Sequence, residues 1–71
     1  MAKDAIIIQA QPFDLHGTTY YQLVFSYTDN LEVAHTARLG HESVYPNPQS
    51  GDQVIVESVI NTVVEVKKKI G

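Results

Sequence analysis

The stretch Tyr27-Thr28-Asp29-Asn30-Leu31 decides the fold, because it predicts a hairpin whose loop fixes the inward faces of two strands. A three-residue hairpin loop needs one residue in the left-handed backbone region, which asparagine tolerates better than other non-glycine residues. A loop that ends on Asn30 pairs Tyr27 with Leu31. The pairs that follow gather the larger apolar groups on one face: Phe25 opposite Val33, Leu23 opposite His35, and Tyr21 opposite Ala37. A slip of one residue would send them to the wrong side of the sheet.

A second stretch, Ser58-Val59-Ile60-Asn61-Thr62, carries asparagine at the same place. Side chains alternate between the two faces of a strand, so the same loop length again fixes the register. It pairs Val56 with Val64 and Val54 with Val66, and these four valines are expected to face inward together. The two hairpins predict a small antiparallel β domain with one apolar interior.

Five strands are expected along the chain. Runs of β-branched and aromatic residues, bounded by Pro, Gly and Asn, place them at 4–10, 19–27, 31–39, 52–58 and 62–68. Three consecutive isoleucines at 6–8 put apolar groups on both faces of the first strand. Residues 11–18 are expected as a loop in which Pro12 ends the ladder. Residues 41–45 are expected to form at most one helical turn.

The composition describes one small domain over residues 1–71. A chain of this length buries no more than about 60% of the surface that its extended form exposes. It has no cysteine, so disulfides and thiolate metal sites are excluded, and a partner subunit becomes the expected source of added stability. The isoleucine run is too short for a signal peptide or a membrane span. We therefore expect a soluble, cytoplasmic protein that associates with itself or with another protein and not with membranes.

The charges are unevenly distributed. The net charge is −3, all eight carboxylates lie between Asp4 and Glu65, and three of the five basic residues form the run Lys67, Lys68 and Lys69. An acidic body repels the phosphates of nucleic acid, so generic affinity for nucleic acid would have to come from this basic tail. The tail is more typical of a charged strand end that discourages edge-to-edge association.

The expected strand order predicts a barrel. Three strands, a connection with at most one helical turn and two further strands bury their apolar faces most economically by closing into a small barrel. This order resembles the OB-fold over roughly residues 4–68, and the stretch PNPQSGDQVIV at 46–56 is similar to the entry into the fourth strand of many such barrels. The segment after Gly40 is shorter than is usual in that fold, which leaves an SH3-like barrel as the alternative.

The resemblance implies where a ligand would lie, namely on the outer face of the second and third strands. That face would present Tyr20, Gln22, Val24, Ser26, Glu32, Ala34, Thr36 and Arg38. Tyr20 and Arg38, together with the lysine tail, carry the alternative hypothesis of a domain that binds single-stranded nucleic acid. One aromatic ring and one guanidinium make a weak stacking platform, so an ordinary polar sheet face is favoured here.

Apolar side chains at loops carry the preferred hypothesis of protein binding. Phe13 and Leu15 fall in the first loop, and Val59 with Ile60 at the tip of the second hairpin, where exposure is expected. An equally weighted alternative has Phe13 or Leu15 folding back to plug the open end of the barrel.

A second apolar surface follows from the strand order. If the first and fourth strands are neighbours, Ile7 and Ile55 point outward side by side, with Val63 near them. A symmetric dimer would bury such a patch at about 25 cal/mol per Å² of apolar area, before the costs of association. The alternative is that the amino-terminal residues or the stems of the terminal lysines cover it.

Catalytic and metal chemistry find no support in the residue pattern. His16, His35 and His41 have no metal-ligand spacing, and His35 is expected in the core beside Leu23. The serines lack a strand-turn-helix elbow, and the four glycines are not clustered into a phosphate loop. We therefore expect a noncatalytic interaction module with no enzyme activity, cofactor or metal, which forms homodimers or binds another protein.

Overall fold

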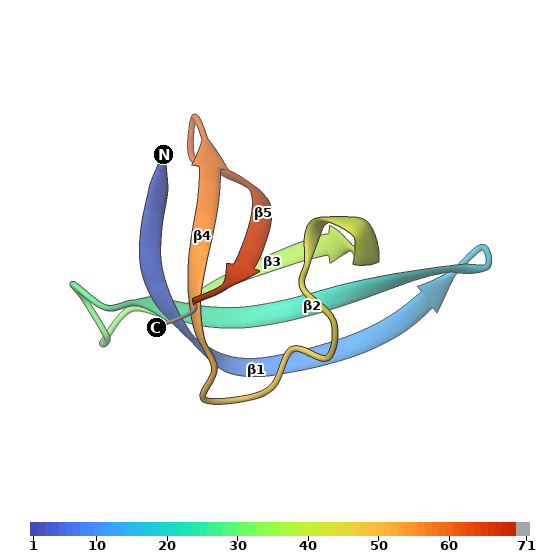
Figure 1. Cartoon of the computed structure of the whole chain (residues 1–71), viewed down its shortest axis with the longest axis horizontal. Helices are drawn as coiled ribbons and strands as arrows, with labels where there is room; N and C mark the ends of the chain where they lie inside the picture. The colour runs from blue at the N-terminus through green and yellow to red at the C-terminus, as the bar shows by residue number, and fades with distance from the viewer. Residues whose placement is uncertain (70–71) are drawn as a thin grey trace.

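The computed structural model describes residues 1–69, which form one antiparallel sheet in the order β3-β2-β1-β4-β5 (Figure 1). The strands are β1 (Ala2–Leu15), β2 (Thr18–Tyr27), β3 (His35–Gly40), β4 (Gln53–Val59) and β5 (Thr62–Lys68). One 3₁₀ turn, η1 (His41–Ser43), follows β3 within the stretch expected to hold a single turn. The structure confirms an all-β fold of five antiparallel strands.

The long first strand joins the two halves of the sheet. β1 pairs with β4 through residues 2–6 and with β2 through residues 5–15, and it curves strongly between these partners (Figure 1). Ile8 is a β-bulge, because the register shifts between Ile7 and Gln9, and a bulge bends its strand. The expected neighbouring of the first and fourth strands is confirmed.

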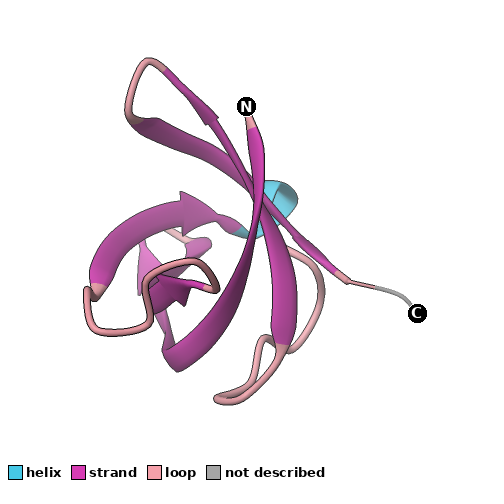
Figure 2. Ribbon diagram, turned by 90° about the vertical axis from the view of Figure 1, so that its left-hand side faces the viewer, coloured by secondary structure: helices cyan, strands magenta, loops and turns pink. Residues whose placement is uncertain are grey.

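The sheet curls toward a barrel without closing. Figure 2 shows the β4–β5 hairpin standing away from the curved β2–β3 pair. Within the described residues, β3 and β5 are the two edge strands, and a single parallel bridge between Val44 and Val66 ties the segment after η1 to β5. We call the opening between β3 and β5 the seam.

The core lies inside this curl. Its buried members come from β1, β2, β4, β5 and the segment after η1: Ala5, Ile7, Leu23, Phe25, Val44, Val54, Val56 and Val66. Side chains of β3 contribute from the side, since Ala37 and Leu39 pack against this cluster while remaining half-buried. The predicted alternation therefore holds in β3, where Arg38 is exposed between these two residues.

The first strand is longer than expected, and Pro12 does not end it. Pro12 pairs with Tyr21, and β1 continues to Leu15. The reason is that β4 covers β1 only as far as Ile6, so the outer edge of β1 has no strand partner around Pro12. A proline that turns its missing N–H to a free edge breaks no ladder bond. A two-residue turn, His16–Gly17, then joins β1 to β2, and both residues have positive φ, 54° and 81°.

The expected register of the β2–β3 hairpin is wrong by two residues. Phe25 pairs with His35 and not with Val33, and the loop spans residues 28–34. Asn30 does not take up positive φ, and the Ser26 hydroxyl, in a residue that is 2% exposed, donates to the Val33 carbonyl at 2.8 Å. This bond holds Val33 in the loop. A shift of two residues keeps the parity of the strand, so the inward set of β2 is as predicted.

The β4–β5 hairpin has a two-residue turn and a bulge. Ile60 and Asn61 both have positive φ, 47° and 63°, and Val59 pairs with Thr62. The register then shifts, so that Val56 pairs with Val66 and Val64 is the extra residue. The prediction of four inward valines is therefore right for Val54, Val56 and Val66 and wrong for Val64, which is 41% exposed.

Candidate functional site

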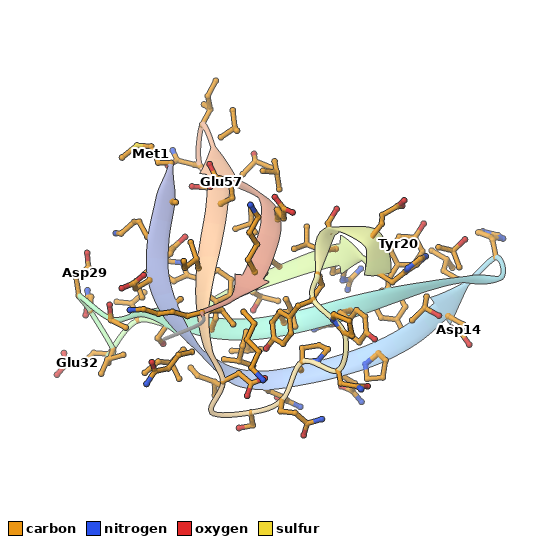
Figure 3. The ribbon with its side chains drawn as sticks, in the orientation of Figure 1. Met1, Asp14, Tyr20, Asp29, Glu32 and Glu57 are labelled. Atoms are coloured by element: carbon orange, nitrogen blue, oxygen red, sulfur yellow. The ribbon has the colours of Figure 1, made fainter. Side chains whose placement is uncertain are left out.

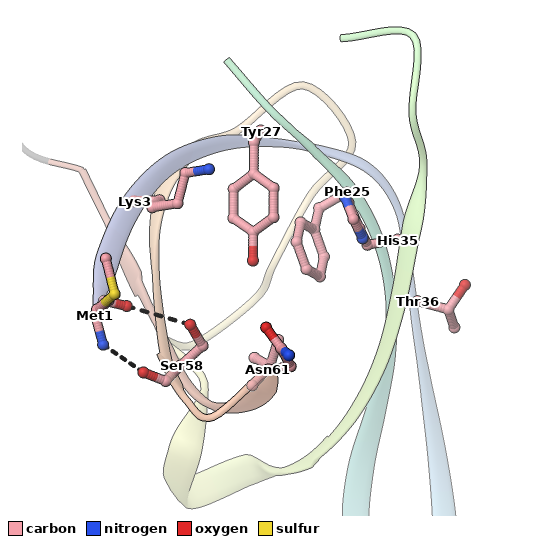
Figure 4. A pocket seen from close by; sticks show the side chains of 9 residues that line it. Met1, Lys3, Phe25, Tyr27, His35, Thr36, Ser58 and Asn61 are labelled. Carbon is pink, nitrogen blue, oxygen red and sulfur yellow. Dashed lines mark hydrogen bonds between the residues drawn. The ribbon is translucent and has the colours of Figure 1, made fainter. Parts of the chain in front are cut away.

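The seam contains a pocket of about 570 Å³ (Figure 4). Phe25 and Tyr27 of β2 and His35 of β3 line one wall. The other wall comes from the β4–β5 hairpin, with Ser58, Asn61 and Val63. Phe25 forms the apolar floor because it is 1% exposed, whereas His35 stands at the rim.

Three rings in this pocket form one cluster. The His35 ring stacks on Phe25 at 5.5 Å and lies 4.9 Å from Tyr27, and Phe25 meets Tyr27 edge to face at 5.4 Å. The Lys3 Nζ lies 4.5 Å from the centre of the Tyr27 ring and 3.0 Å from an Asp29 oxygen. A cation over the ring face is attracted by the ring quadrupole. The pocket thus joins an aromatic floor to a charged rim, a combination common in binding sites.

The residue pattern does not predict this pocket. His35 was expected to be a core residue beside Leu23, but it is exposed and pairs with Phe25. The error follows from the two-residue register shift, because a three-residue loop would have carried His35 deeper into the sheet. The alternation of side chains along the first strand does predict on which face Lys3 lies. Lys3 pairs with the buried Val56, so its side chain faces the interior.

The tip of the β4–β5 hairpin presents two predicted partner-binding residues. Val59 is 55% exposed and Ile60 is 91% exposed. Ile60 also holds φ at 47°, a region that costs a β-branched residue free energy. An isoleucine that is both strained and solvated contributes little to the stability of the fold.

The other predicted tip residues, Phe13 and Leu15, do not lie in a loop and do not plug the barrel. Leu15 ends β1 at 50% exposure. Phe13 lies on β1 opposite Tyr20, and the two rings stack at 5.7 Å with an interplanar angle of 22°. The expected loop placement of Phe13 is therefore wrong, because it assumed that Pro12 ended the strand, and partner binding by Phe13 stays a prediction.

The Phe13–Tyr20 stack belongs to the outer face of the sheet. Gln11, Gln22 and Arg38 lie beside it and border a shallow cleft of about 230 Å³. A Cβ added at Gly40, opposite Tyr20, would lie 3.8 Å from the Tyr20 ring and 3.7 Å from Glu42 Oε1, so a carboxylate borders the stack. The face thus carries two rings and one guanidinium. Three other residues predicted for this face do not lie on it as expected: Ser26 is buried, and Glu32 and Ala34 are in the β2–β3 loop.

The predicted isoleucine patch does not exist in the form expected. Ile7 is 1% exposed and lies in the core, because the inward set of β1 is Ala5 and Ile7. Ile55 is half-buried, and Asp4 lies opposite it on β1. The Lys69 Nζ bonds an Asp4 oxygen at 2.9 Å, so its stem crosses β4 on that outer face. Val63 faces the seam pocket instead of this side.

The basic tail is partly neutralised and lies away from the Phe13–Tyr20 stack. Lys69 pairs with Asp4 at 2.9 Å, and Lys67 lies 3.8 Å from a Glu65 oxygen. Lys68 borders a separate pocket near Tyr45. β5 ends near the middle of the molecule, whereas Tyr20 lies toward one end (Figures 1 and 3).

A tyrosine and a carboxylate organise the connection between η1 and β4. The Tyr45 hydroxyl donates to Asp52 Oδ2 at 2.7 Å, and the Gln49 N–H donates to the same oxygen at 3.0 Å. Burial and the neighbouring carboxylate raise the pKa of Tyr45 well above its ordinary range. The hydrogen bond from Tyr45 lowers the pKa of Asp52. We regard this pair as structural, because it fastens the segment after η1 to the residue directly before β4.

Metal-binding clusters and membrane-spanning helices are both missing from residues 1–69. No three His, Asp or Glu side chains of this part of the chain gather as metal ligands, and His16, His35 and His41 lie in separate places. No helix in the same residues is long and apolar enough to cross a bilayer.

Comparison with protein-family models, curated proteins and solved structures finds no match for this chain.

Proposed function

We propose that the protein is a noncatalytic interaction module that binds a protein partner, or a second copy of itself, through the tip of its β4–β5 hairpin. Ile60 carries this proposal, because it is 91% exposed while holding φ at 47°. Type I′ turns of this kind favour Asn or Gly at both central positions. An apolar, strained residue there has a cost to folding that binding to a partner would offset.

The neighbouring residues support the same proposal. Val59 precedes Ile60 at 55% exposure, and Val64 at the adjoining bulge is 41% exposed. Three exposed apolar side chains therefore lie on this one hairpin. A chain without cysteine suits a reducing cytoplasmic setting, where stability from disulfides is not available and a partner subunit can supply it.

Replacing Ile60 tests the proposal. Ile60→Asn keeps the positive φ that the turn needs and removes the apolar contact, so partner binding should fall while the fold is kept. Leu31→Thr is the matched control, because Leu31 is a 59% exposed apolar residue in the β2–β3 loop. Sedimentation equilibrium at high micromolar concentration reports self-association, and photo-crosslinking from position 62, which is exposed beside the turn, reports other partners. Equal behaviour of the two variants in both measurements would refute the proposal.

A second candidate function is binding of single-stranded nucleic acid to the outer face. The Phe13–Tyr20 stack favours it, since it doubles the aromatic surface beside Arg38 and adds to the likeness with OB-fold binding faces. Glu42 beside Gly40 and the acidic body oppose it.

Salt dependence tests this second candidate. Oligonucleotide affinity should fall steeply as salt rises, and it should drop further on Tyr20→Ala or Arg38→Ala. Leu31→Thr again serves as the control. Absence of binding at low salt would remove the candidate.

A further inference from the structure

β3 offers a free edge whose direction can be worked out from the ladder. The Thr28 N–H donates to the Asp4 carbonyl at 3.1 Å, so even-numbered residues of β2 turn their backbone groups toward β1. Odd-numbered residues of β2 turn toward β3, where their partners are also odd-numbered. The backbone N–H and C=O groups of Thr36 and Arg38 therefore point to the seam.

The edge of β3 lacks the features that usually protect an edge strand. Proteins blunt edges with proline, lysine, bulges or inward charges. β1 has Pro12 on its free edge, and β5 has a bulge at Val64 and the charged Glu65 and Lys67. β3 has neither proline nor bulge, and Arg38 is its one fixed charge. An unprotected edge is a template for another strand.

The seam pocket lies directly beside this edge. Its lining includes His35 and Thr36 of β3, and Val63 of β5 lies on the opposite side. In Figure 4, Phe25 and Tyr27 project into the space between β3 and the β4–β5 hairpin, whereas Thr36 points away from it. An added strand would therefore place its inward side chains over Phe25, in a cavity of about 570 Å³.

We propose that β3 binds an extended segment of another protein as an added strand in the seam, and that this segment alternates apolar and acidic residues. Side chains of an added strand keep step with those of its neighbour. Those beside His35 and Ala37 would point to the aromatic floor and be apolar. Those beside Thr36 and Arg38 would lie on the outer face, where a carboxylate pairs with the guanidinium.

Pairing with the β3 strand of a second copy fits this edge less well. In a pairing of two β3 strands, the inward side chains of both copies must share one face of the sheet. Two antiparallel registers centred on the strand meet this condition. One places Ala37 opposite Ala37 of the second copy, and the other places Arg38 opposite Arg38. Both place the two Arg38 side chains opposite or diagonal to each other on one face. Like charges at these positions are destabilising, so the charge on β3 favours a foreign acidic segment.

The test uses a fluorescently labelled peptide, acetyl-Val-Glu-Val-Glu-Phe-Glu-Val-Glu, titrated with the full chain. Thr36→Pro removes an N–H from the free edge and leaves the β2–β3 ladder intact, so the Kd should rise about tenfold. Arg38→Glu should weaken the same peptide and restore binding to a version with lysine in place of glutamate. Ile60→Asn should leave the Kd unchanged, which separates this proposal from that of the hairpin tip.

Amide hydrogen exchange gives a readout independent of affinity. The bound peptide should slow exchange at Thr36 and Arg38, and a peptide of the same composition with its valines and glutamates in separate blocks should not. The proposal is overturned if neither peptide binds at millimolar concentration, or if the blocked peptide binds equally well. It is also overturned if the lysine peptide fails with Arg38→Glu, or if the free chain is a dimer that Thr36→Pro dissociates.

Discussion

At the scale of single residues, Ile60 combines backbone strain with solvent exposure. Most substitutions in a folded protein destabilise it. Ile60→Asn should do the opposite and raise the free energy of unfolding by about 1 kcal/mol, because asparagine tolerates positive φ at the first turn position. Urea unfolding measures the change, with Leu31→Thr as an exposed control near zero. A loss of stability in Ile60→Asn would show that the side chain packs in solution.

The Tyr45–Asp52 hydrogen bond makes stability depend on pH at both extremes. The pKa of Asp52 is lowered in the folded state, so its contribution is present above the ordinary value of 3.8 and is lost as pH falls through the folded pKa. The pKa of Tyr45 is raised, so its contribution is present below the ordinary value of 10.0 and is lost as pH rises beyond it. Tyr45→Phe should reduce the pH dependence of stability at both the acidic and the alkaline end, which thermal melting across pH measures. An unchanged pH dependence would mean that the hydrogen bond is open in solution.

At the scale of elements, the face of the sheet to which each side chain points is more predictable than the pairing of residues between neighbouring strands. The inward set Tyr21, Leu23 and Phe25 follows from alternation alone, and the structure keeps it. The β2–β3 register depends on how many residues the loop consumes. A buried hydroxyl that bonds Val33 sets that number, and local turn propensity does not contain this contact.

Bulges explain most of the remaining errors. Ile8 and Val64 each add one residue to a strand, and each changes which neighbours face inward beyond it. The expected inward Val64 fails for this reason, whereas Ile7 lies before the bulge and faces inward by regular alternation with Ala5. The seam pocket could not be predicted either, since its two walls come from hairpins that meet only when β1 bends.

The β2–β3 loop should depend on its anchor. Ser26→Ala removes the 2.8 Å bond to the Val33 carbonyl and should lower the free energy of unfolding by about 1 kcal/mol. Amide hydrogen exchange in residues 28–34 should become faster by more than the change in the global free energy of unfolding explains. Ser50→Ala is a control, because its hydroxyl bonds the Ile8 carbonyl from an exposed position. Equal loop exchange in the two variants would contradict the anchoring role.

At the scale of the whole molecule, the small core leaves little reserve of stability. A chain of this length is expected to be stable by on the order of 4–10 kcal/mol. Phe25→Ala should cost about 3–5 kcal/mol, a large share of that stability, because Phe25 is 1% exposed. Phe13→Ala removes the same group from the outer face and should cost about 1 kcal/mol. Circular dichroism during urea titration compares them, and equal midpoints would show that the core is placed incorrectly.

The β1–β2 hairpin ends far from the seam, at the right-hand extreme of Figure 1. Both residues of its turn have positive φ, and a Cβ built on Gly17 meets no atom within 4 Å. Proteins tolerate inserted residues best at exposed loop tips of this kind. A reporter epitope or fluorophore tag inserted between His16 and Gly17 should therefore leave the fold intact and report binding at the β4–β5 tip or at the β3 edge without touching either of those two surfaces.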